Sequence, residues 1–270
     1  MSAYRLAVAA AASTLALALS VSCSGATPSL GLPPVRHVVI VMFENHEESS
    51  VDGSAQASAF ERYAGRYADL ADYTAVAHPS LPNYLALVSG STQGVTTDCM
   101  DCGPWSHSIG GLLTRAGKTW GGYAEGYPAS DLFTKTHMPF LYFKDGAGHV
   151  HRLSRLDARH LPAYSFIAPN LCDDAHSCPL ASANTFLERW LPPLLRAPST
   201  AVFVLFDEGT TSIGGGGRIE AFVAGTAVKQ HVVVRRRVDH YTVLRTIEDL
   251  FRLPHLGASK TTKPLTGIWR

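Results

Sequence analysis

The sequence predicts an α/β fold, a mainly parallel central sheet with helices on both faces. Two apolar, β-branched stretches, residues 35–43 and 201–206, are continuous enough to be buried strands and too short to be core helices. Between and after them, segments with apolar residues at helical spacing alternate with further short apolar runs. Such alternation is typical of chains that build parallel sheets.

The expected elements follow one another in a regular order. Residues 57–70 place Phe60, Tyr63 and Ala64 at helical spacing. Pro192 and Pro193 should interrupt a later helix, because proline lacks the backbone N–H. Polar, cysteine-containing segments are expected to be loops. We expect strands at 35–43, 119–123, 163–167, 201–206 and 219–224, helices at 57–70, 82–88, 109–116, 184–195 and 241–251, and loops at 91–110 and 169–178.

The first residues are expected to be a signal peptide, residues 1–26, followed by a Pro/Gly linker, residues 27–34. Arg5 supplies a positive charge before an Ala/Leu-rich run, and small residues follow. The run is shorter than the about 20 residues that a membrane span needs. We therefore expect a secreted chain with a single domain at 35–270. Acylation of Cys23, as in a lipoprotein, is the alternative.

The charge and the cysteine content of the chain bear on its partners and its disulfides. The chain has 270 residues, of which 46% are hydrophobic, and a formal net charge of +1. Without a basic stripe there is no electrostatic case for nucleic acid as a partner.

In an exported chain, the cysteine pairs Cys99/Cys102 and Cys172/Cys178 most simply form two local disulfides. Other connectivities, and a redox or zinc role for the first pair, stay open.

Polar residues follow the two most apolar strands. Glu44 and Asn45 come after residues 38–43, and Asp207 and Glu208 come after residues 201–206. Ligands of open α/β sheets bind at the carboxyl ends of the strands. If the two strands are neighbours, three carboxylates and an amide converge. Like charges this close repel one another, and a bound cation would offset that repulsion. All-oxygen donors suit one divalent ion, Ca²⁺, Mg²⁺ or Mn²⁺.

A serine stands at the expected start of a helix. Ser80 lies two residues before Pro82, which a first helical turn tolerates. It can cap the helix, or it can attack phosphorus if a metal or a base lowers the proton affinity of its hydroxyl. Asn83 lies one turn further on the same side, where phosphoryl binding and helix packing are both open. Asp239 can cap the helix that follows it or orient His240.

Six segments together resemble the bacterial phosphoesterase family, which holds secreted acid phosphatases and nonspecific phospholipases C. Each segment alone is weakly specific, but their number and order make the set specific. The resemblance covers nearly the whole expected mature chain. The segments are VVIVMFEN, HPSLPNYLALVSG, HMPF (137–140), SFIAPNLCDDAHSC (165–178), FDEG and HYTVLRTIEDLFRLPHLGA (240–258).

The resemblance implies an alkaline-phosphatase-like sandwich fold and a metal-assisted serine mechanism with a phosphoserine intermediate. It implies a nucleophile, histidines that protonate the leaving oxygen, and further residues that contact the phosphoryl group. These are Ser80 as nucleophile, His137 and His176 as acids, Asp174 and His240 as substrate contacts, and Glu44, Asn45, Ser80, Asp207 and Glu208 as metal ligands. Asn83 is a further candidate substrate contact, from its position one helical turn after Ser80.

The expected activity is that of a secreted acid phosphatase acting on phosphate monoesters, with phosphoinositides as a further substrate class. Histidine acids, with an ordinary pKa near 6.5, would suit an acidic optimum. A phospholipase C-type phosphodiesterase is the first alternative, although those relatives usually carry additional C-terminal domains. An inactive surface or binding protein that retains the fold is the second.

Overall fold

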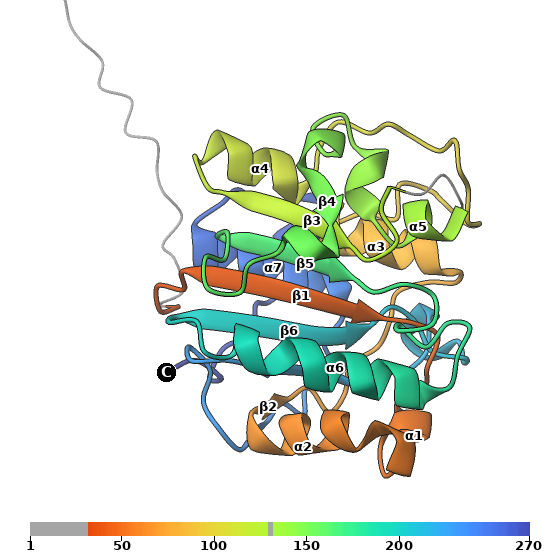
Figure 1. Cartoon of the computed structure of the whole chain (residues 1–270). Helices are drawn as coiled ribbons and strands as arrows, with labels where there is room; N and C mark the ends of the chain where they lie inside the picture. Colours follow the sequence, from red (N-terminus) through yellow and green to blue (C-terminus); the bar gives the residue numbers. More distant parts are fainter. Residues whose placement is uncertain (1–31, 129–131) are drawn as a thin grey trace, which may run out of the picture.

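The computed structural model describes residues 32–128 and 132–270 (Figure 1). The expected signal peptide, Cys23 and residues 27–31 of the expected linker lie outside the described residues. Within the described part of the chain, no helix is both long enough and apolar enough to cross a membrane.

The described strands form one mixed, mostly parallel sheet in the order β4-β3-β5-β1-β6-β7-β2-β8. The expected fold class is confirmed. The strands are β1 (His37–Phe43), β2 (Ala68–Asp69), β3 (Trp120–Ala124), β4 (Val150–Arg152), β5 (Tyr164–Ala168), β6 (Thr200–Phe206), β7 (Ala221–Ala224) and β8 (Val232–Val233).

Only β7 runs against its neighbours, β6 and β2. The connection from β6 to β7, residues 207–220, contains one short 3₁₀ turn and no α-helix. A parallel pair needs a crossover that is usually helical, whereas an antiparallel pair can be joined by a loop. The direction of β7 therefore follows from its connection.

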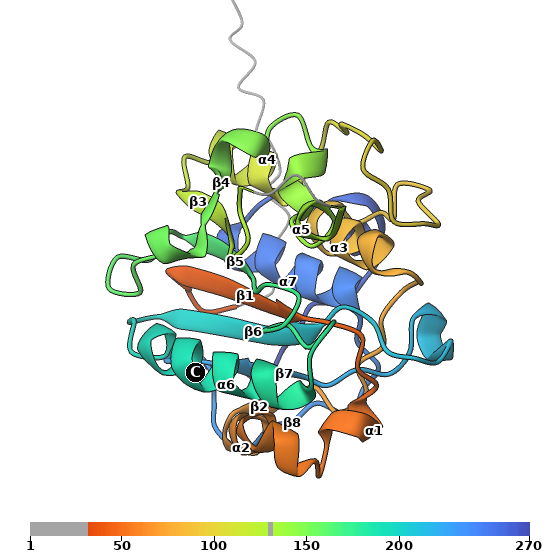
Figure 2. The same ribbon diagram turned by 45° about the vertical axis from the view of Figure 1, so that its right-hand side comes forward.

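Helices cover both faces of the sheet. Helices α2 and α6 lie on one face, and α3 and α7 on the other (Figures 1 and 2). The helices are α1 (Glu48–Val51), α2 (Ser58–Arg66), α3 (Ser80–Ser89), α4 (Ile109–Arg115), α5 (Leu132–Thr136), α6 (Leu180–Leu194) and α7 (His240–Phe251).

The two central strands are buried on both sides. Every residue of β6, and every residue of β1 after His37, is buried. A strand covered on both faces has no polar side, which explains the continuous apolar runs in the sequence. β1 and β6 are parallel neighbours, so their carboxyl ends lie at the same edge of the sheet.

Two helices differ from expectation. The helix expected at 57–70 ends at Arg66, because residues 68–69 pair with β7 instead. The helix expected to break at Pro192 and Pro193 continues to Leu194. Each proline removes one N–H donor, but both lie in the last turn, so little helix follows that they could disrupt.

Two disulfides have the expected local pairing. Cys99 bonds to Cys102 and Cys172 to Cys178. The second closes the loop after β5, which reaches the same sheet edge as the ends of β1 and β6, since β5 is parallel to β1.

Candidate active site

The carboxylates that follow β1 and β6 meet because the two strands are in register. Phe43 pairs with Phe206, and the Asp207 N–H donates to the carbonyl oxygen of Phe43 at 2.9 Å. The Asn45 N–H in turn donates to Asp207 Oδ1 at 3.0 Å. The predicted pairs, Glu44 with Asn45 and Asp207 with Glu208, therefore share one edge of the sheet.

Ser80 is the first residue of α3, and its side chain faces these carboxylates. Its Oγ lies 3.2 Å from Glu44 Oε2 and 3.2 Å from Glu208 Oε1. The hydroxyl does not cap the helix, because Pro79 takes the N-cap position and the Ser80 hydroxyl faces the two carboxylates instead. Either neighbouring carboxylate could accept the Ser80 proton, which suits a nucleophile.

Burial and mutual repulsion disfavour the charged forms of these carboxyl groups. Desolvation, and then the charges of Asp207 and Asp174, raise the pKa of Glu44 well above its ordinary value. Burial and the charge of Glu208 raise the pKa of Asp207 to about 7. Burial also raises the pKa of Glu208, although its hydrogen bond with His78 opposes this. A cation among these groups would offset the repulsion.

The donor atoms fit a hard divalent cation. Asp207 Oδ2 is buried and finds no hydrogen-bond partner among the described residues. Glu44 Oε2 and Glu208 Oε1 both face the Ser80 hydroxyl. The Asn45 Nδ2 donates to Glu44 Oε2 at 3.4 Å, which places the Asn45 amide beside these carboxylates. Carboxylate, amide and hydroxyl oxygens are the ligands that Ca²⁺, Mg²⁺ and Mn²⁺ prefer.

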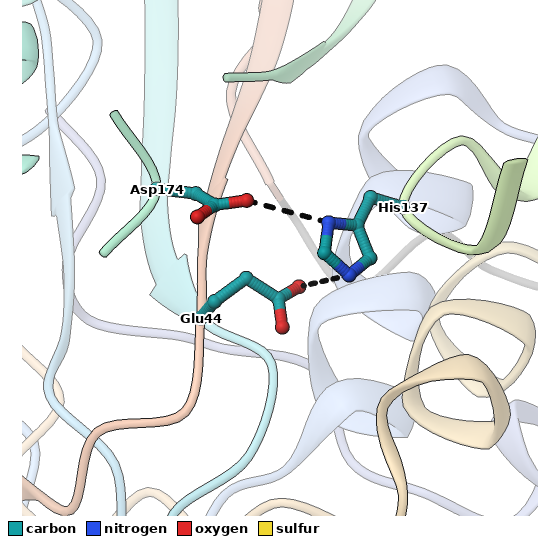
Figure 3. Close-up of side chains that lie close together, drawn as sticks. All are labelled: Glu44, His137 and Asp174. Atoms are coloured by element: carbon teal, nitrogen blue, oxygen red, sulfur yellow. Dashed lines mark ion pairs between the residues drawn. The ribbon is translucent and has the colours of Figure 1, made fainter. Parts of the chain in front are cut away.

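His137 lies between two buried carboxylates (Figure 3). Its Nε2 is 3.4 Å from Glu44 Oε1, and its Nδ1 is 3.3 Å from Asp174 Oδ2. One atom from each of the three side chains lies within 4.8 Å of the others, so this group could also hold a metal ion. Metal-binding histidines commonly donate their second ring N–H to a carboxylate. The two candidate cation positions share Glu44.

His176 lies beside His137 on the loop closed by the Cys172–Cys178 disulfide. The centroids of the two imidazole rings are 5.8 Å apart. The main-chain N–H of His176 donates to Asp174 Oδ1 at 2.8 Å. Burial, and then the nearby His137, lower the pKa of His176 below its ordinary value. The structure thus brings the two predicted acids and Asp174 together.

Asn83 and His240 have partners within the protein. The Asn83 Oδ1 accepts the N–H groups of Val76 and Ala77 at 3.0 and 3.1 Å. Its Nδ2 donates to the carbonyl oxygens of Ala77 and Pro79 at 2.8 and 3.2 Å. Asn83 thereby holds the segment that leads into Ser80.

His240 is fully buried. Its Nε2 contacts the carbonyl oxygen of Asp207 at 2.7 Å, and its Nδ1 contacts the Tyr73 hydroxyl at 2.8 Å. The helix that it begins is capped by Asp239, whose Oδ1 accepts the Thr242 N–H at 2.8 Å. Asp239 therefore caps α7, which is one of the two roles that the sequence left open.

Sequence reasoning missed two residues of this site. His78 Nδ1 forms a short contact with Glu208 Oε2, and the Tyr84 hydroxyl donates a short hydrogen bond to Glu44 Oε1. The Tyr84 ring also stacks on His137, with centroids 5.4 Å apart. Tyr84 lies one helical turn after Ser80, so its spacing was the available signal.

A hollow of about 410 Å³ opens beside His137, between the ends of β3 and β5 and helix α5. Its walls are mainly apolar, and they include Phe133, Ala168 and Leu171. Room for an organic group therefore exists on the side of His137 away from the central carboxylates.

The chain is similar to known phosphatases. It is 30% identical over 276 residues to the phosphatidylinositol-3-phosphatase of Mycobacterium tuberculosis, a match covering 94% of this chain and 91% of that one. It is also 30% identical over 220 residues to the phosphate-repressible acid phosphatase of Penicillium chrysogenum, covering 70% of this chain and 53% of that one. The match thus spans about half the length of the fungal enzyme.

A solved structure shares the fold. A protein of the alkaline phosphatase superfamily from Vibrio parahaemolyticus matches with a TM-score of 0.61 at 12% identity, covering 87% of this chain and 71% of that one. That likeness establishes an alkaline-phosphatase-like fold. The profile of the Phosphoesterase family matches residues 53–254. The chain therefore belongs to the Phosphoesterase family, as a phosphoric ester hydrolase of the acid phosphatase type.

Proposed function

We propose that this chain hydrolyses phosphate monoesters through a phosphoserine at Ser80, with one divalent cation as cofactor. The observation that carries the proposal is the position of the Ser80 hydroxyl, 3.2 Å from Glu44 and 3.2 Å from Glu208. A buried hydroxyl between two carboxylates at the carboxyl ends of parallel strands is poised for nucleophilic attack.

The cation would be held by oxygen atoms of Glu44, Asn45, Asp207 and Glu208, together with the Ser80 hydroxyl. The buried Oδ2 of Asp207, without a hydrogen-bond partner among the described residues, supports this assignment. When bound, the cation would supply positive charge that lowers the proton affinity of the hydroxyl and offsets the phosphoryl charge. The donor set suits Ca²⁺, Mg²⁺ and Mn²⁺ alike.

The reaction has two halves. Ser80 Oγ attacks phosphorus, its proton passes to Glu44 or Glu208, and the bond between phosphorus and the ester oxygen breaks. His137 or His176 gives a proton to the leaving alkoxide. Water then attacks the phosphoserine and yields its proton to that histidine. Phosphate departs, and the carboxylate returns the proton to Ser80.

Phosphate monoesters are the proposed substrate class, with phosphoinositides such as phosphatidylinositol 3-phosphate among them. The activities of the similar phosphatases support this choice, and the apolar hollow beside His137 offers room for the alcohol. Phospholipase C-type cleavage of diesters, or a binding role without turnover, would appear in the same experiment as different outcomes.

The experiment compares substrates and variants of the purified chain with Ca²⁺, Mg²⁺ or Mn²⁺ supplied. Hydrolysis of p-nitrophenyl phosphate, but not of p-nitrophenyl phosphorylcholine, is expected. Ser80→Ala should lower kcat by at least about 1,000-fold. Ser89→Ala, on the same helix and equally buried, is the matched control and should keep its activity. A Ser80→Ala protein with substantial turnover, or a preference for the diester, would overturn the proposal.

We further propose that the chain is exported and loses residues 1–26. The charged and apolar pattern of that segment supports export, and the two local disulfides suit an oxidising compartment. The mass of the mature N-terminus tests this proposal. A fragment that begins with an acylated Cys23 would show a lipoprotein instead.

A further inference from the structure

The carboxylate of Glu47 accepts four hydrogen bonds from the loop between β6 and β7. Its Oε2 accepts the N–H groups of Thr210 and Thr211 at 2.8 and 3.2 Å. Its Oε1 accepts the Thr211 hydroxyl and the Arg218 N–H, each at 2.9 Å. Burial would raise the pKa of Glu47, but these hydrogen bonds outweigh it and lower the pKa. The ionised carboxylate of Glu47 thus accepts hydrogen bonds from backbone N–H groups of the loop that have no partner in the sheet.

Glycines let this loop pack closely on both sides. A Cβ atom on Gly209 would lie 2.1 Å from Glu47 Oε2, and one on Gly216 would lie 2.3 Å from the carbonyl oxygen of Ala77. Glycine is required at Gly216, because the close atom there belongs to the backbone, whereas a side chain at Gly209 would displace the Glu47 carboxylate. The loop therefore lies between the Glu47 carboxylate and the segment that precedes His78.

The same loop reaches the active site through His78. The carbonyl oxygen of Thr211 lies 2.8 Å from His78 Nε2, and His78 Nδ1 contacts Glu208 Oε2. A carbonyl and a carboxylate both act as acceptors, so this geometry suits an imidazolium that donates from both nitrogens. The other oxygen of Glu208 faces Ser80 Oγ at 3.2 Å. An unbroken series of contacts therefore leads from Glu47 to the nucleophile.

We propose that Glu47 is a positioning residue for the reaction. It fixes the loop so that the Thr211 carbonyl holds His78, and His78 in turn directs the Glu208 carboxylate at Ser80. This inference rests on the proposed role of Ser80. Glu47 contacts neither Ser80 nor a substrate site, so its effect must pass through the loop.

The test is Glu47→Gln, which replaces one acceptor oxygen by an amide that faces N–H donors. We expect kcat for p-nitrophenyl phosphate to fall about 10- to 100-fold, because small misplacements of catalytic groups have effects of this size. KM should change less than about twofold. Hydrogen exchange of residues 209–218 should speed up. Glu48→Gln is the matched control, because Glu48 pairs with the Arg218 side chain at 3.2 Å and leaves Thr211 untouched.

A double-mutant cycle separates positioning from a general structural role. If Glu47 acts through His78, Glu47→Gln combined with His78→Gln should be no slower than His78→Gln alone. Independent, multiplying losses would overturn the inference, as would wild-type kcat in Glu47→Gln or an equal loss in Glu48→Gln. If Glu47→Gln fails to fold, Glu47→Asp takes its place in the cycle, with a smaller expected loss and the same criterion.

The two proposals can fail separately. If Ser80→Ala abolishes turnover while Glu47→Gln keeps wild-type kcat, only the inference about Glu47 is wrong. If the wild-type chain hydrolyses no phosphoester with any of the three metals, the proposed function is wrong and the inference falls with it.

Discussion

His240 Nε2 donates its hydrogen to the main-chain carbonyl oxygen of Asp207, 2.7 Å away. On the other side of the ring, Nδ1 accepts the hydrogen of the Tyr73 hydroxyl at 2.8 Å. Burial lowers the pKa of His240 to about 4, so the ring is neutral and both nitrogens are occupied. His240 therefore supports the main chain at Asp207, and neither of its ring nitrogens is free to contact a phosphoryl group.

His240→Phe should therefore lower kcat about tenfold with little change in KM, because a shifted Asp207 backbone misplaces its carboxylate. The loss of two buried hydrogen bonds should also cost about 1–3 kcal/mol of stability. Steady-state kinetics and urea unfolding measure both. Tyr73→Phe removes only one bond and should have the smaller effects. A raised KM with unchanged kcat would instead indicate direct contact with substrate.

Asn83→Leu should destabilise the fold and the Ser80 segment together. The variant leaves the partly buried N–H groups of Val76 and Ala77 without their acceptor, which should cost about 1 kcal/mol for each lost hydrogen bond. The midpoint of urea unfolding should fall accordingly. A variant of normal stability whose only defect is a higher KM would favour phosphoryl binding, the other role that the spacing from Ser80 left open.

Tyr84→Phe keeps the ring that stacks on His137 and removes only the hydroxyl that donates to Glu44. We expect about a tenfold lower kcat, because Glu44 loses a donor that orients it toward Ser80. Tyr142→Phe is the control, since its hydroxyl donates to the Cys99 carbonyl oxygen. Equal kinetic effects in both variants would contradict a specific role for Tyr84.

Glu248 gives stability a pH dependence that arises outside the active site. It is fully buried, and burial raises its pKa from 4.5 to about 8. Between these two values the folded state keeps a proton that the unfolded state has lost, so stability falls as pH rises from about 4.5 to about 8.

Glu248→Gln mimics the neutral carboxyl group and can keep the bonds to Leu256 and Ser259. Its melting temperature should exceed that of the wild type by a few degrees at pH 8, at about 2–4 °C for each kcal/mol, and should match it near pH 4. The exposed Glu61→Gln is the control. A constant offset between Glu248→Gln and the wild type at all pH values would refute this assignment.

The central strands of the sheet and the polar residues that follow them could be predicted from the sequence. A strand buried on both faces must be apolar throughout, so residues 35–43 and 201–206 were unambiguous. Parallel strands end at one edge, which brought Glu44 and Asp207 together in the prediction as in the structure. The short strands β2, β4 and β8 could not be found, because two or three residues carry no periodicity and their partners decide their pairing.

The side-chain partners were harder to predict. Membership in a motif does not distinguish a substrate contact from a packing role, because the groups that bind Asn83 and His240 are mostly main-chain atoms. A hydrogen bond to a main-chain atom does not depend on the residue type of the partner, so the sequence does not reveal which residue provides it. His78 and Glu47 were missed for a related reason: their role depends on a glycine-rich loop more than 100 residues away.

The most direct measurement of the central claim is a rapid acid quench during turnover of a phosphate monoester, followed by peptide mapping. We expect a phosphate group on Ser80, present in the wild type and absent in Ser80→Ala. A phosphate on another residue would contradict it. So would unmodified protein together with inversion of configuration at phosphorus, measured with a monoester made chiral at phosphorus by oxygen isotopes, since direct attack by water inverts once and a phosphoserine route retains.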